Sequence, residues 1–219
     1  MALSTFAEIK SAVADWAYAG SGITSTLVGT DFFPQMQAMM YYGHGADIPP
    51  LRTRQMLTST TLTPASGGLI TITSALGTNW LENQEITPTT TGAVSLDYVD
   101  PWQFRKQYEE LTSNTGPQSF YTIEGGVIYL APAAVTEVTV RWYGKFTALS
   151  ADSDTDWIVT NAPHVYLDGC LMLACAYADD EREGRFRQKF AAGIKALNMT
   201  DQRQRASGST PVARPRSVA

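Results

Sequence analysis

The sequence has little of the residue types on which most enzyme and metal chemistry depends, with two histidines and two cysteines among 219 residues. Cys170 and Cys175 lie five positions apart on one predicted helix, so they cannot form a disulfide without unwinding it. They also lack partners at zinc-ligand spacing. His44 and His164 have no nucleophile at a recognisable motif spacing. The unpaired thiols indicate assembly in a reducing compartment.

Asp152, Asp154 and Asp156 alternate like the start of a calcium-binding loop, but the rest of the sequence pattern of that loop is absent. The sixth position of that loop is Trp157 instead of glycine, and the twelfth is Pro163 instead of glutamate. These aspartates are instead expected to form a turn before a helix. We therefore predict no catalytic residues, no cofactor and no metal, and a protein that is not an enzyme.

No segment has the length or composition of a membrane span or a signal peptide. Residues 1–14 lack a basic leader followed by an apolar run, so no signal peptide is expected. The apolar run 170–178 is shorter than the roughly 20 residues that a span requires. A helix that is apolar all round must be covered by its own domain or by neighbouring subunits. We therefore expect a buried helix here.

Two helices are predicted in the C-terminal third of the chain. Asn161 is a candidate cap for the first, with Pro163 in its first turn. Asp180 and Glu183 have the spacing of a capping box for the second. One stripe of the second helix is apolar, formed by Phe186, Phe190, Ile194 and Leu197. The apolar pattern ends after Leu197.

Two further helices are predicted near the N-terminus. Thr5 and Glu8 form a capping box for the first. The second is expected over residues 31–42, with Pro34 in its first turn and Gly43 as its C-cap. These four helices are expected to pack as a bundle. Its predicted core side chains are Phe6, Ile9, Trp16, Phe186, Phe190 and Ile194.

The middle of the chain has a composition typical of β-strands, with runs rich in threonine and β-branched residues between turn residues. Hairpins are predicted over residues 58–73, 86–98 and 119–130. A short amphipathic helix is expected at about 100–111, with Trp102, Tyr108 and Leu111 as anchors. Alternation of Val138, Val140 and Trp142 predicts a half-buried strand.

The predicted fold class is α+β, a helical bundle with an inserted β domain. Residues 1–56 would supply the N-terminal helices and residues 57–148 the β-rich insertion. Residues 149–198 would supply the C-terminal helix pair, and residues 199–219 an extended basic tail.

Charge is divided unevenly along the chain, although the net charge is only −5. Residues 182–219 hold nine Lys or Arg and two acids, giving +7, so residues 1–181 carry −12. This division suggests either head-to-tail attraction between subunits or an acidic partner for the tail. A solvated basic helix face with a loose tail would have the same composition.

The tail contains four arginines and no acid after Asp201. They are Arg203, Arg205, Arg214 and Arg216. Prolines keep its last part extended. We expect the tail to order as it docks on an acidic protein surface. Non-specific contact with phosphates is the alternative.

The chain resembles the head–tail adaptor (head-completion, connector) proteins of tailed bacteriophages. The resemblance begins with TFAEIKSAVADWAY and DFFPQMQAMM, and continues with residues 117–126, similar to the family hairpin P–x–x–Y/F–x–I–x–G–G. The family's L–x–P follows as Leu130–Ala131–Pro132. Matches in the later helical stretch are Pro163, Tyr166, Leu167, Gly169, Leu171, Ala174, Tyr177, Asp180 and Arg182.

This resemblance implies a homo-oligomer, usually a ring of twelve subunits, in the head–tail neck of a virion assembled in the host cytoplasm. The ring would bind the portal protein above and a downstream tail or nozzle protein below, and would line the channel for packaged DNA. The tail would reach the portal, and the β insertion would meet the next tail component. An acidic ring repels phosphates, so DNA would pass without specific binding.

Two other functions remain open from the sequence. A tail or baseplate module that binds carbohydrate or another partner would need aromatic side chains exposed together, with Trp80, Trp102 and Trp142 as candidates. A non-specific DNA-binding protein would be retained on DNA in a salt-sensitive way through its tail arginines.

Overall fold

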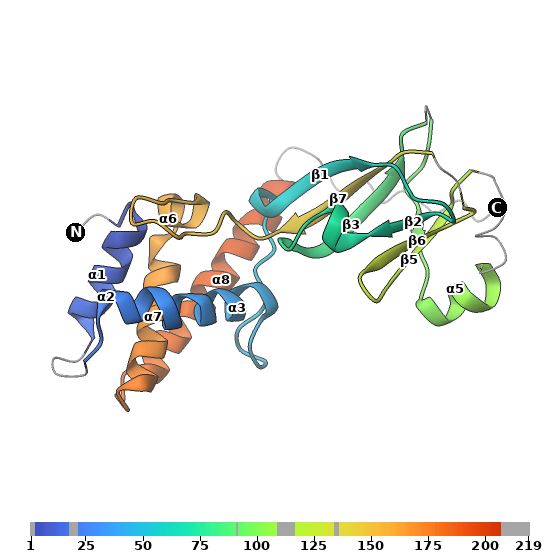
Figure 1. Ribbon diagram of the computed structural model, residues 1–219. Helices are drawn as coiled ribbons and strands as arrows, with labels where there is room; N and C mark the ends of the chain where they lie inside the picture. Colours follow the sequence, from blue (N-terminus) through green and yellow to red (C-terminus); the bar gives the residue numbers. More distant parts are fainter. Residues whose placement is uncertain (1–2, 18–21, 91, 109–116, 134–135, 207–219) are drawn as a thin grey trace. The chain divides into compact units, whose positions relative to one another are not determined.

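The computed structural model describes residues 3–17, 22–90, 92–108, 117–133 and 136–206 (Figure 1). Helices and sheets are both present, so the fold class is α+β as predicted. The chain divides into two compact units. The helical unit comprises Met1–Gln55 with Thr147–Ala219, and the β unit comprises Met56–Phe146.

The first helix, α1 (Phe6–Trp16), begins with the predicted capping box. The Glu8 N–H donates to Thr5 Oγ1 at 3.4 Å, and the Thr5 N–H donates to Glu8 Oε2 at 3.1 Å. Phe6 and Ile9 are buried, but Trp16 is 54% exposed. Its prediction as a core residue is wrong because it is the last residue of α1 and lies past the turns that pack on the core.

The second helical stretch starts earlier than predicted. It comprises α2 (Ser25–Leu27), the π-helical turn η1 (Val28–Phe32) and α3 (Phe33–Tyr42), and Thr24 Oγ1 caps its start. Pro34 lies in the first turn of α3, as predicted, although the helical stretch as a whole begins at Ser25. Proline has no N–H to donate, and a widened turn precedes it, in which the Phe33 N–H donates to the Val28 carbonyl. Gly43, with φ +78°, ends α3 as predicted.

The C-terminal part of the helical unit is built around α7 (Pro163–Tyr177), which contacts α1, α3 and α8 (Glu183–Ala206). A short helix, α6 (Trp157–Asn161), precedes it and is capped by Asp156. The prediction that Asn161 caps a helix is wrong, because its Nδ2 donates to the Trp157 carbonyl within α6. Most α7 side chains are buried, so the unit itself covers most of this helix.

Helix α8 continues through Ala206, beyond the predicted end of the pattern at Leu197. Residues 199–206 are therefore helical and not part of an extended tail. Tertiary contacts explain why the helix extends past Leu197. Asn198 Oδ1 accepts from the Arg52 N–H at 2.9 Å, and Asp201 Oδ1 accepts from the Arg54 N–H at 2.9 Å. Residues 207–219 lie outside the described residues.

The 3-10 turn η2 (Arg54–Met56) leads into the β unit, which contains two sheets. The first has the order β1-β7-β3, with β1 (Leu57–Leu62) and β3 (Trp80–Pro88) antiparallel to β7 (Val138–Gly144). Val138, Val140 and Trp142 are buried, whereas Arg141 is exposed, so the alternation predicted for β7 is confirmed.

The second sheet has the order β2-β6-β5-β4. Its strands are β2 (Leu69–Thr71), β4 (Asp97–Tyr98), β5 (Phe120–Glu124) and β6 (Val127–Ala131). The third predicted hairpin is confirmed, because β5 and β6 pair across Gly125 and Gly126, both with positive φ. Glycine adopts that backbone at no steric cost.

The other two predicted hairpins are wrong. Strand β1 pairs with β7 while β2 pairs with β6, so the segments on either side of the 64–68 turn enter different sheets. Likewise β3 pairs with β7, and β4 pairs in parallel with β5.

Side chains of both sheets form one hydrophobic core, including Ile86, Ile128, Leu130 and Val140. The short helix α4 (Ile72–Ala75) adds Ile72 to it. Helix α5 (Pro101–Tyr108) forms where a helix was predicted, but its buried residue is Phe104, while Trp102 is 66% exposed. The predicted anchor Leu111 lies outside the described residues.

Candidate interaction surfaces

The outer face of α8 carries exposed cations among small and apolar residues. Phe186, Phe190 and Ile194 face the core and are buried. Residues three, four or seven apart lie on one helix face, which places Ala192, Ala196 and Met199 together on the opposite side. Met199 is 52% exposed. The exposed cations of this helix include Arg185, Lys189, Lys195 and Arg203.

The end of α8 is held against the segment that follows α3. Asp201 is only 4% exposed and accepts from both the N–H and the Nε of Arg54, at 2.9 and 3.2 Å. Gln204 Oε1 accepts from the Arg54 guanidinium, and Asn198 Nδ2 donates to the Pro50 carbonyl at 3.0 Å. These contacts fix the point from which the tail leaves the helical unit.

The four tail arginines predicted to dock on a partner are only partly described. Arg203 is exposed on the last turn of α8. Arg205 belongs to the helix, and its side chain is not among those described. Arg214 and Arg216 lie outside the described residues.

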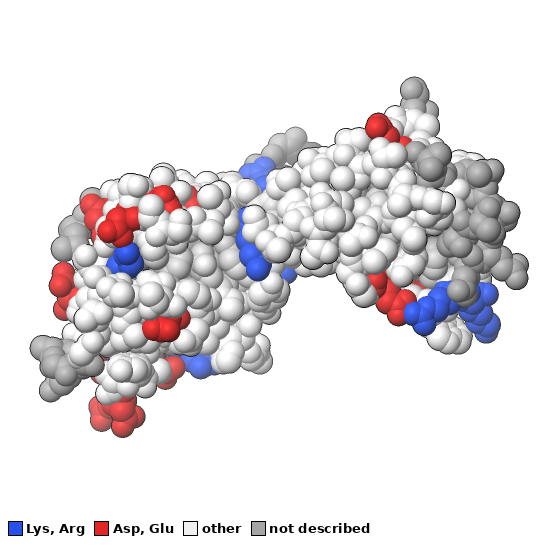
Figure 2. Space-filling model, viewed as in Figure 1, with Lys and Arg blue, Asp and Glu red and all other residues white. Residues whose placement is uncertain are grey.

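Carboxylates gather on the part of the helical unit that carries α1 and the turn before α6, as Figure 2 shows. The Ser4 N–H lowers the pKa of Glu8, and the N–H groups of Ala151 and Ser150 lower the pKa of Asp154. Asp152 accepts from Lys10 Nζ at 2.6 Å. Because hydrogen bonds favour the charged carboxylates, this surface stays anionic at neutral pH.

A second acidic group lies at the elbow between α7 and α8. Asp180 accepts from the Arg182 N–H at 2.9 Å and holds its guanidinium in a fork, at 2.6 to 3.1 Å. The guanidinium lowers the pKa of Asp180. The predicted capping box of Asp180 and Glu183 is wrong, because the Asp180 carboxylate accepts from the Arg182 N–H and the Glu183 N–H donates to the Asp180 carbonyl. Asp179 has φ +51°, and Tyr177 beside it is 62% exposed.

The three alternating aspartates each have a different partner. Asp152 pairs with Lys10, and Asp154 closes the turn through backbone N–H groups. Asp156 accepts from the Val159 N–H at 2.8 Å and from the buried Tyr166 hydroxyl at 2.6 Å, and burial raises its pKa. Within the described part of the chain, no group of three His, Cys, Asp or Glu side chains is arranged to hold a metal ion.

The remaining candidates for chemistry are isolated from one another. Cys170 and Cys175 are free and buried, and burial raises the pKa of both thiols. His44 lies exposed in a short turn in which its N–H donates to the Ile48 carbonyl. His164 is exposed in the first turn of α7. None of the described helices is long and apolar enough to cross a bilayer.

The aromatic side chains that a carbohydrate-binding surface would need are not exposed together. Trp142 is 6% exposed, and its Nε1 donates to Thr60 Oγ1 at 3.3 Å. Trp80 is half-buried against the core, and only Trp102 is largely exposed. These three residues therefore do not form a shared platform.

Comparison with known proteins gives one family. The family model described as SU10 adaptor protein matches residues 4–215. The match spans both units and extends into the basic tail. No curated protein matches the chain.

Proposed function

Because the chain belongs to the SU10 adaptor protein family, a family of phage head–tail adaptors, we propose that it is one subunit of a ring beneath the portal. The ring would hold twelve copies, complete the DNA channel and provide the docking site for the tail. The role is structural, with no catalytic step. The observation that carries this proposal is the family match over residues 4–215.

Charge on the helical unit supports contact between copies. The outer face of α8 carries Arg185, Lys189 and Lys195, whereas the α1 region carries exposed Asp15 and Asp152. When opposite charges lie on different elements of one unit, a head-to-tail contact brings them together in neighbouring copies. Head-to-tail contacts close into rings when the rotation between copies allows it.

The tail is proposed to dock on the portal, and the β unit to meet the downstream tail or nozzle protein. Asp201 and Gln204 hold the end of α8, so the 13 residues after Ala206 start from a fixed point. Arg214 and Arg216 within them suit an acidic portal surface. DNA would slide through the channel without specific contacts.

A truncation after Ala206 tests the tail assignment, because it keeps every α8 contact described above. We expect an unchanged far-UV circular dichroism spectrum and portal binding weakened at least tenfold, measured by titration with purified portal. A full-length Ser207→Ala, Ser209→Ala variant is the control and should bind normally. Unchanged portal binding by the truncated chain would reject the assignment.

Changing Arg203, Arg205, Arg214 and Arg216 to glutamine separates this proposal from non-specific DNA binding. A tail that binds phosphates predicts that the unaltered chain is retained on DNA at low salt and that the variant is not. Our proposal predicts weakened portal binding by the variant and no difference in DNA retention.

A further inference from the structure

A hollow of about 450 Å³ lies between α8 and the loop that follows α3. The α8 residues that line it recur at spacings of three and four, so they occupy one face of the helix. Several of them are small, namely Gly184, Ala191 and Ala192. Arg187 closes one side, because its Nε and Nη2 donate to the Asp47 carboxylate at 2.7 and 3.3 Å. This charged pair holds the loop against the helix, so the hollow is already formed in the single chain.

Lys195 also lines this hollow and gives it an unneutralised charge. Its side chain is exposed and forms no ion pair with any described residue. Arg187, in contrast, is paired with Asp47 and lies 3.9 Å from a Glu183 oxygen. The small side chains leave room for a bulky group, and the free ammonium attracts a carboxylate. The hollow therefore suits a large apolar side chain that has an acidic neighbour.

That combination occurs at the end of α1 in the same unit. Trp16 is 54% exposed, and the adjacent Asp15 is exposed as well. Neither side chain has a hydrogen bond, ion pair or ring contact within the described part of the chain. Tryptophan offers a large area for burial and is enriched among the residues that contribute most to binding.

The other large apolar side chains exposed on the helical unit fit the hollow less well. The Tyr177 ring packs on its own unit, with its centroid 5.7 Å from that of Phe32. Met199 belongs to α8, the helix that carries the hollow, and Tyr42 ends α3 beside the loop that borders it. Trp16 comes from another side, since α1 and α8 pack against opposite sides of α7 in Figure 1.

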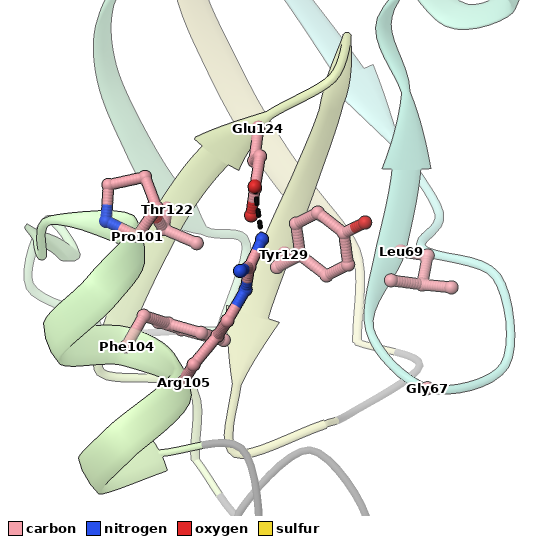
Figure 3. Close-up of a pocket in the computed structure, with 8 residues that line it drawn as sticks. All are labelled: Gly67, Leu69, Pro101, Phe104, Arg105, Thr122, Glu124 and Tyr129. Carbon is pink, nitrogen blue, oxygen red and sulfur yellow. Dashed lines mark hydrogen bonds and ion pairs between the residues drawn. The ribbon is translucent and has the colours of Figure 1, made fainter.

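A second hollow, of about 340 Å³, lies beside α5 in the β unit (Figure 3). Its lining cation is already neutralised, because Arg105 forms an ion pair with Glu124. The rings of Phe104 and Tyr129 have centroids 6.5 Å apart, which leaves no space between them for an indole. This hollow is therefore not a suitable receptor for Trp16.

We propose that Trp16 of one copy inserts into the α8 hollow of the next copy, which brings Asp15 beside Lys195. A projecting side chain and its hollow on different sides of one unit make a head-to-tail contact, the kind that can close into a ring. The contact buries an aromatic side chain and joins two charges that have no partner among the described residues. This inference rests on the proposed ring and names the side chains that link its copies.

Engineered cysteines test the contact directly, because the native Cys170 and Cys175 are buried. Rings of the Trp16→Cys, Ala192→Cys double variant are assembled on purified portal and treated with a mild oxidant. We expect disulfide-linked dimers, trimers and longer multiples of the chain on a non-reducing gel. Ser11→Cys, Ala192→Cys is the matched control, since Ser11 is exposed on another face of α1, and should give at least tenfold less linkage. Equal linkage in the two variants, or a disulfide within one chain, would overturn the proposal.

Trp16→Ala should raise the chain concentration that half-assembles rings on the portal by at least tenfold, measured by sedimentation velocity. The melting temperature should stay unchanged, because the indole is exposed. Trp102→Ala, which removes an exposed indole of the β unit, is the control and should assemble normally. Asp15→Lys should weaken assembly about three- to fivefold, and adding Lys195→Asp should restore it, because the charge pair is then reversed.

The outcomes separate this contact from the ring on which it rests. Normal assembly by Trp16→Ala would overturn the contact and leave the proposed ring standing. Failure of the unaltered chain to form rings on the portal would contradict the ring itself, and this contact with it.

Discussion

Asp201 is the most buried of the residues that hold the end of α8 in place. Its carboxylate is 4% exposed and accepts two hydrogen bonds from Arg54, one from the backbone N–H and one from Nε. A hydrogen bond to a charged group contributes about 1.5–3 kcal/mol to the free energy of unfolding. The buried Asp201 side chain therefore acts with Asn198 and Gln204 to join the last turns of the helix to the segment after α3.

Replacing Asp201 with alanine should lower the free energy of unfolding of the helical unit by about 2 kcal/mol, because the Arg54 N–H loses its partner. The measurement is urea denaturation followed by helical circular dichroism. Arg203→Ala, two residues further along an exposed face, is the matched control and should change it by less than about 0.5 kcal/mol. Equal effects from the two variants would contradict this role of Asp201.

At the scale of the elements, α7 can lie close to its neighbours because Gly169 has no side chain. A Cβ at this position would lie 2.5 Å from Met36 Cγ of α3 and 2.8 Å from Phe190 Cε2 of α8. Both neighbours are fully buried, so neither has room to move away. The absence of one methyl group thus lets three helices meet.

Gly169→Ala is expected to lower the free energy of unfolding by about 1–3 kcal/mol, the usual cost of overpacking a core. Gly184→Ala is the control, since a Cβ there meets nothing within 4 Å, and it should leave stability unchanged or raise it by up to about 1 kcal/mol. Thermal and urea unfolding of both variants test this. A stabilising Gly169→Ala would show that the helices are not in close contact there.

The elements that were predictable from sequence have local signals. The capping box of α1, Gly43 after α3 and the Gly125–Gly126 turn of the β5–β6 hairpin each act within a few residues. The predictions that proved wrong concern elements whose structure depends on contacts with residues distant in the sequence. Strand β1 pairs with β7 across about 80 residues, and Asn198 extends α8 through Arg52. Periodicity and turn residues carry no information about such contacts.

The candidate surfaces were only partly predictable for the same reason. Phe6, Ile9, Phe186, Phe190 and Ile194 follow helical spacing and are buried, whereas Trp16 follows the same spacing and is exposed. Spacing shows which face a residue occupies and not how far the neighbouring helices reach.

At the scale of the whole molecule, membership of the adaptor family gives each unit a proposed partner. The helical unit would contact its copies through oppositely charged elements, and the tail would extend from the fixed end of α8 to the portal. The β unit would be left for the downstream component. All three assignments require that the chain occupies the neck in several copies.

Electron cryomicroscopy of the neck of the assembled virion tests that requirement most directly. We predict a ring of twelve copies beneath the portal, with helical units side by side, α8 cations of one copy near carboxylates of the next, and tails reaching the portal. A neck without this chain, or with copies that do not contact one another through their helical units, would contradict the account.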